Sequence, residues 1–78
     1  MLLWLALLEL TVRLEKSRQL LKLAYMMQSS FEGIGIQEIQ DKFEVSRSTA
    51  GRMRDTVVRL FPHVEEMRID GKTKRWRL

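Results

Sequence analysis

The stretch from Gly33 to Leu60, GIGIQEIQDKFEVSRSTAGRMRDTVVRL, has the pattern of two short helices joined by a tight turn. Two groups of apolar residues at helical spacing occupy it, with Val45 between them: Ile36, Ile39 and Phe43, then Ala50, Met53, Val57 and Leu60. Ser46 directly precedes the second helix, where its hydroxyl can accept from a free backbone N–H, and loss of such a cap costs about 1 kcal/mol. The pattern predicts helices over 36–43 and 46–60, with Ser46 as the helix cap and the second apolar group turned inward.

The second of these helices should present a polar and cationic surface at its N-terminal end. With the apolar residues inward, Arg47, Ser48, Gly51 and Arg52 face outward. Arg52 and Asp55 are three residues apart, so we expect them to pair across one turn. Short polar and guanidinium side chains at the exposed start of a helix suit the DNA major groove. The alternative is an ordinary solvated face in a small helical domain.

Length and composition restrict the classes of function. A chain of 78 residues makes one domain, 1–78, which buries only about 60 to 65% of the surface of its unfolded chain, so an enclosed catalytic cleft is not expected. There are no cysteines, which excludes disulfides and thiolate zinc sites and fits a reducing cytoplasm. The lone His63 lies beside Pro62 and has no second metal ligand near it. With no nucleophile and base pair and no phosphate-binding glycine loop, we expect neither an enzyme nor a cofactor, metal or small-molecule site.

Positive charge is concentrated in the C-terminal part of the chain. Residues 1–45 carry five Lys or Arg against six Asp or Glu, whereas residues 46–78 carry nine against four, which gives net charges of −1 and +5. Such polarisation is typical of a surface that binds a polyanion, because each neutralised phosphate releases condensed counterions. The alternative is a basic surface that serves solubility.

The chain opens with ten residues, MLLWLALLEL, that are apolar except for Glu9. This run is short of the roughly 20 apolar residues that cross a membrane, and no basic residues precede it as in a signal peptide. We expect one long helix over 2–28, in which 1–12 is an apolar extension and 13–28 packs in the core. Residues at alternating steps of four and three have coiled-coil spacing: Leu3, Leu7, Leu10, Leu14, Ser17, Leu21 and Ala24. We expect a homodimer through this helix; the alternative is that 1–12 packs on a missing domain or reflects the choice of start site.

The last segment, 64–78, has the pattern of a β-hairpin, because Asp70-Gly71 is a favoured two-residue turn between strand-like alternations. With that turn as the loop, Glu65 would face Trp76. One side would then form a packing face of Met67, Ile69, Trp76 and Leu78. The tip and flanks carry Lys72, Lys74 and Arg75, placed to meet phosphates or the minor groove; the alternative is a hairpin that only closes the core. Phe31, in the loop before the first short helix, is expected to plug the core.

Together these segments predict a mainly α domain with a small β-hairpin, a winged helix-turn-helix whose first helix is extended at its N-terminus. Several runs support this layout: Arg18-Gln19-Leu20-Leu21-Lys22-Leu23, Gly33-Ile34, Glu38-Ile39, Phe43-Glu44-Val45-Ser46-Arg47-Ser48-Thr49, Arg52-Met53-Arg54-Asp55, Asp70-Gly71-Lys72 and Arg75-Trp76-Arg77-Leu78. In these runs, residues 18–78 resemble the N-terminal DNA-binding domain of the WYL-domain transcriptional regulators, a DeoR-like winged-helix group. The most specific run is Val-Ser-Arg-x-Thr-x-x-Arg. The chain departs from the family at Gln40 and Glu44, where small residues or glycine are usual.

The resemblance implies a cytoplasmic transcriptional regulator that binds double-stranded DNA sequence-specifically, as a dimer on two half-sites. The family's effector-sensing domain would follow the wing, so the resemblance implies an excised DNA-binding domain or a stand-alone small regulator. Helix geometry and resemblance together give a groove-facing set of Arg47, Ser48, Thr49 and Arg52. The residues expected to neutralise phosphates are Arg54, Lys72, Lys74, Arg75 and Arg18. The alternative is a winged helix that docks a protein partner without binding DNA.

Overall fold

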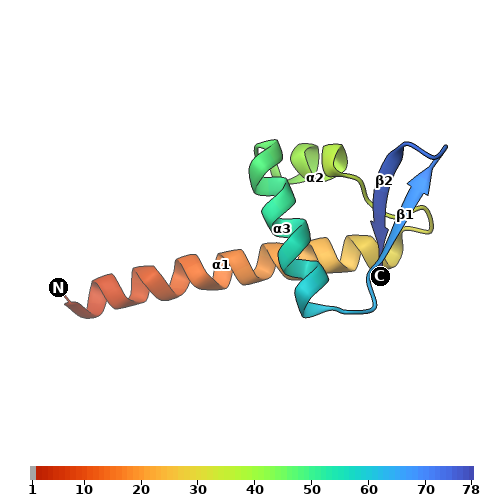
Figure 1. Ribbon diagram of the computed structural model, residues 1–78. Coiled ribbons are helices and arrows are strands. Elements are labelled where there is room, and N and C mark those ends of the chain that lie inside the picture. The colour runs from red at the N-terminus through yellow and green to blue at the C-terminus, as the bar shows by residue number, and fades with distance from the viewer. Residues whose placement is uncertain (1) are drawn as a thin grey trace.

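The computed structural model, which describes residues 2–78, has three helices followed by a two-stranded hairpin (Figure 1). In chain order the elements are α1 (Leu2–Ser29), α2 (Ile36–Phe43), α3 (Arg47–Leu60), β1 (Glu65–Ile69) and β2 (Thr73–Arg77). Helices α2 and α3 lie over the C-terminal half of α1, the hairpin closes the far end, and the N-terminal half of α1 projects alone (Figure 1). This is the predicted winged helix-turn-helix with an extended first helix.

The core lies where α1, α2, α3 and β2 meet. Its buried residues are Leu23, Ala24, Met27, Ile34, Ile39, Ala50, Met53, Val57 and Trp76. The inward orientation predicted for Ala50, Met53 and Val57 is confirmed, but that of Leu60 is wrong, since its side chain is 62% exposed. Val58 and Phe61, on either side of Leu60 in the chain, pack against the core instead, and Leu60 points away from it.

The turn between α2 and α3 is held at both ends by local hydrogen bonds. The Thr49 backbone N–H donates to the Ser46 hydroxyl oxygen at 3.2 Å, which confirms Ser46 as the cap of α3. At the end of α2, Glu44 adopts a left-handed conformation, with φ 54° and ψ 49°, and the next N–H, of Val45, donates to the Gln40 carbonyl oxygen at 3.2 Å. The turn therefore has the geometry that glycine favours, although a glutamate stands there.

Replacing Glu44 with glycine should stabilise the domain. An L-residue in the left-handed region costs roughly 1–2 kcal/mol, part of which glycine recovers, since glycine loses more entropy on folding. We expect Glu44→Gly to raise the unfolding free energy by about 1 kcal/mol, which in a domain of this size raises Tm by about 4–8 °C. Thermal unfolding followed by circular dichroism would measure this. Glu44→Ala, which keeps a Cβ, is the control and should stay within about 0.5 kcal/mol of the wild type; a destabilised Glu44→Gly would contradict the account.

The hairpin forms at the predicted turn but in a different register. Asp70 and Gly71 both have positive φ, 56° and 71°, and the Lys72 N–H closes the turn on the Ile69 carbonyl oxygen at 3.1 Å. Lys72 itself stays outside the ladder, which begins with Ile69 opposite Thr73. This extra residue shifts every later pair by one position, so Trp76 lies opposite Glu66 and not Glu65.

The predicted packing face of the hairpin is therefore wrong for Met67 and Ile69, whereas Trp76 and Leu78 do pack with the core as predicted. Side chains alternate between the faces of a strand, so a shift of one residue moves a side chain to the other face. Trp76 is buried on one face, whereas Met67 and Ile69 lie on the other, with Met67 paired to Arg75. Trp76 thus belongs to the buried core, and Val64 and Leu78, which flank the two strands, pack against that core.

The loop before α2 joins the hairpin as a third, very short strand. Ile34 and Trp76 exchange two backbone hydrogen bonds, of 2.8 and 2.9 Å. The prediction that Phe31 plugs the core is wrong, because its side chain is 85% exposed. Ile34 closes the core from this loop, and the Phe31 ring instead lies beside the Arg77 guanidinium, 5.7 Å from the ring centroid.

Candidate nucleic-acid interface

The outward face of α3 carries the residues predicted from helical spacing. Because Ala50, Met53 and Val57 turn inward, the opposite stripe contains Arg47, Ser48, Gly51, Arg52 and Asp55, all exposed except the half-buried Gly51. A Cβ added at Gly51 would meet only the Arg54 guanidinium, at 3.7 Å. The centre of this stripe is therefore open for the approach of another molecule.

A hollow of about 570 Å³ separates this stripe from the wing. It is lined by Gly35, Ile36, Gln37, Glu38, Arg47, Arg54, Lys72, Thr73, Lys74, Arg75 and Trp76. Five of the predicted DNA-contacting residues, two from α3 and three from the wing, thus lie around one depression although they are far apart in sequence. Glu38 is the one carboxylate among the lining residues, so the depression is strongly cationic.

Arg54 is held in place by two neighbours. Its Nε and Nη2 atoms each lie 2.9 Å from Oδ1 of Asp55, and its guanidinium carbon lies 4.6 Å from the centroid of the Trp76 ring. The predicted pair of Arg52 with Asp55 is therefore wrong, since Asp55 turns toward the wing side of α3 and pairs with Arg54. Arg54 links α3 to β2, while Arg52 stays clear of this contact.

Arg75 is used inside the molecule. Its guanidinium donates to the carbonyl oxygens of Glu32 and Gly33, at 3.0 and 2.8 Å, and also forms an ion pair with Glu38. These contacts fix β2 to the loop that precedes α2. Arg75 contributes charge to the hollow, but its Nε and Nη2 atoms are already engaged by these internal partners.

Three cations on this side of the molecule have no ion pair within residues 2–78: Arg47, Arg52 and Lys72. Lys74 lies 3.7 Å from Glu66, but both side chains are about half exposed, and such pairs contribute little and exchange readily. These four side chains are therefore available to an external anion. Thr49, from the predicted groove-facing set, accepts a hydrogen bond at its hydroxyl from Ser46 and lies toward α1.

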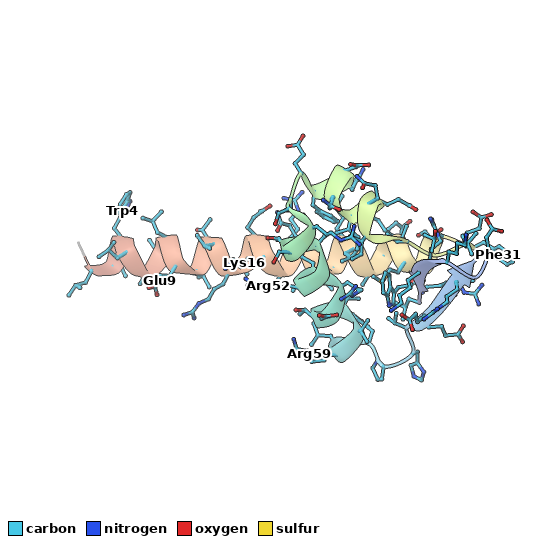
Figure 2. The ribbon with its side chains drawn as sticks, turned by 45° about the horizontal axis from the view of Figure 1, so that its top comes forward. Trp4, Glu9, Lys16, Phe31, Arg52 and Arg59 are labelled. Atoms are coloured by element: carbon cyan, nitrogen blue, oxygen red, sulfur yellow. The ribbon has the colours of Figure 1, made fainter. Side chains whose placement is uncertain are left out.

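A second hollow, of about 340 Å³, lies between α1 and α3. It is lined by Lys16, Gln19, Leu20, Val45, Thr49, Arg52, Met53 and Thr56. Figure 2 shows Lys16 of α1 and Arg52 of α3 near the crossing of the two helices. Lys16 was missed as a candidate, although it stands one turn before Leu20 on the side of α1 that faces α3. Arg18, which was predicted as a phosphate contact, is exposed on α1 and lines neither hollow, so the structure does not bring it together with the others.

No protein-family model matches this chain, and no curated protein matches it either. Within residues 2–78, no helix is long and apolar enough to cross a membrane. The same residues contain no group of three His, Cys, Asp or Glu side chains placed to hold a metal ion. The helices and the hairpin have the layout of a winged helix-turn-helix domain, with cationic side chains on α3 and the wing.

Proposed function

We propose that this domain binds double-stranded DNA, with the N-terminal half of α3 in the major groove and the hairpin tip against the phosphate backbone. The observation that carries the proposal is that Arg47 and Arg52 lie on the exposed face of α3 and form no ion pair with any described residue. Arg47 also shares a hollow with Lys72 and Lys74 of the wing. An α-helix fits the major groove, and arginine pairs with guanine there through two parallel hydrogen bonds.

In this arrangement the side chains have different tasks. Arg47 and Arg52 would read base edges, with Ser48 beside them on the same exposed stripe. Lys72 and Lys74 would neutralise phosphates and so contribute affinity without sequence preference. Gly51 has no side chain, so the helix backbone in the middle of the stripe could approach the groove closely. We further propose the role of a transcriptional regulator of the WYL type, acting in the cytoplasm as a homodimer.

Substitutions on α3 and on the wing should have different effects on DNA binding. Duplexes selected from a random pool supply the cognate site. On it, Arg52→Ala should weaken binding by about 1–3 kcal/mol, roughly 5- to 150-fold, while binding to random DNA changes far less. Lys74→Ala should weaken both kinds of binding equally and reduce the slope of log affinity against log salt by about 1. Fluorescence anisotropy at several salt concentrations would measure all of these.

Arg59→Ala is the matched control, because Arg59 is also exposed on α3 but lies at its opposite end, outside both hollows (Figure 2). Its binding should equal that of the wild type. Equal losses on cognate and random DNA for Arg52→Ala would contradict the assignment of base reading to α3. Failure of the wild type to retard any duplex, even at low salt, would favour the alternative of a protein-docking winged helix.

A further inference from the structure

The projecting half of α1 carries a leucine stripe that is exposed along its length. Leu3, Leu7, Leu10 and Leu14 follow one another at steps of four, three and four residues, and their side chains are between 52% and 76% exposed. This spacing places them along one side of the helix, as in the seam of a coiled coil. All described residues from 2 to 18 are exposed, and this half of α1 stands clear of the helical core and the wing (Figure 1).

We propose that a second copy of this chain covers the stripe in an antiparallel pair, with Leu3 against the partner's Leu14 and Leu7 against the partner's Leu10. In this register all four seam leucines of each chain meet leucines, and the pairing ends just before Lys16, where the hollow between α1 and α3 begins. The role of this pair in DNA binding rests on the proposed function. The contact between the two helices is inferred from the leucine stripe alone.

A parallel pair fits the same stripe less well. Its seam would continue from Leu14 to Ser17, which places two hydroxyls in an apolar layer. It would also bring Arg13 of each chain toward the partner's Arg18 across the seam, a like-charge contact. In addition, its two-fold axis would run along α1, which turns the two α3 helices to opposite sides of that axis. The antiparallel pair has its two-fold axis perpendicular to α1, so both α3 helices can face the same side.

The antiparallel register also sets the distance between the two DNA-reading surfaces. Helix α3 lies against α1 near Lys16, Gln19 and Leu20. The centre of the paired segment falls between Leu8 and Glu9, about ten residues away. At about 1.5 Å of rise per residue, the two α3 helices would lie about 30 Å apart along α1. This is a few ångströms less than the separation of two half-sites one DNA turn apart, about 34–36 Å.

Cysteine crosslinking tests this register directly, because the chain has no cysteines of its own. Leu3→Cys and Leu14→Cys chains, carrying tags of different size, would be oxidised separately and as a mixture. A disulfide requires Cα atoms within about 7 Å. We expect a disulfide only in the mixture, between one chain of each kind, and we expect a dimeric mass for the wild type by light scattering.

A disulfide in Leu14→Cys alone would show parallel pairing and overturn the proposal, as would a monomeric wild type or a dimer that forms no mixed disulfide. DNA binding is measured separately on the wild type. A monomer that still binds its selected duplex would overturn the pairing and leave the proposed function intact. A crosslinked antiparallel dimer that retards no duplex would support the pairing and contradict the proposed DNA binding.

Discussion

Replacing Trp76 with alanine is expected to remove most of the stability of the domain. The Trp76 side chain is only 7% exposed and belongs to the buried core together with residues of α1, α2 and α3. Loss of a buried tryptophan typically costs about 3–5 kcal/mol, while a whole domain has about 5–15 kcal/mol and a small one lies at the low end. The Arg54 guanidinium, which lies 4.6 Å from the centroid of this ring, would also lose this contact.

Urea unfolding followed by circular dichroism would measure this loss. Phe31→Ala is the matched control, because it also removes an aromatic ring from the region that joins the hairpin to the body, but one that is 85% exposed. We expect Phe31→Ala to stay within about 0.5 kcal/mol of the wild type. If Trp76→Ala cost less than about 1 kcal/mol, the hairpin would not be part of the folding unit, in conflict with the burial of Trp76.

Replacing Gly33 with alanine is expected to separate the loop before α2 from the hairpin. Gly33 has φ +78°, and an added Cβ would lie 2.9 Å from the Trp76 carbonyl oxygen, which is backbone and cannot rotate away. That oxygen accepts the 2.8 Å hydrogen bond from the Ile34 N–H, so any shift weakens the bridge to β2. The left-handed conformation costs roughly 1–2 kcal/mol and the clash adds to it, which gives a loss of about 3 kcal/mol.

Gly71→Ala separates the cost of the left-handed backbone conformation from the cost of the clash. Gly71 also has positive φ, +71°, but nothing lies within 4 Å of an added Cβ there. It should therefore show only the conformational cost, about 1–2 kcal/mol. Equal losses in the two variants, measured by the same urea unfolding, would mean that the contact between Gly33 and Trp76 does not constrain the fold.

Features that depend on local sequence could be predicted, because they arise from neighbouring residues. The cap at Ser46 and the helical spacing of Ala50, Met53 and Val57 determine where α3 begins and which side it buries. The turn at Asp70-Gly71 was also predicted. The register of the hairpin could not be predicted, because an alternating pattern does not reveal that a single residue, Lys72, stays unpaired. This unpaired residue places each side chain of β2 on the opposite face, relative to β1, from the predicted one.

Only the part of the candidate site that lies on α3 could be predicted from the sequence. Helical geometry gives the outward direction of Arg47 and Arg52, whatever the rest of the chain does. The neighbours of Arg54 and Arg75 depend instead on tertiary contacts, since Arg75 binds carbonyl oxygens of the loop before α2, more than 40 residues earlier in the chain. Helical spacing could have suggested Lys16, but only if the crossing of α1 and α3 had been known.

The central claim is that DNA meets the start of α3 and the tip of the wing. Amide chemical-shift mapping of the labelled domain, titrated with a duplex from the selection, tests it most directly. The account predicts the largest shifts at residues 47–52 and 72–74, with little change at the C-terminal end of α3 around Arg59. Shifts confined to the apolar segment 2–14, or no shifts at low salt, would contradict it.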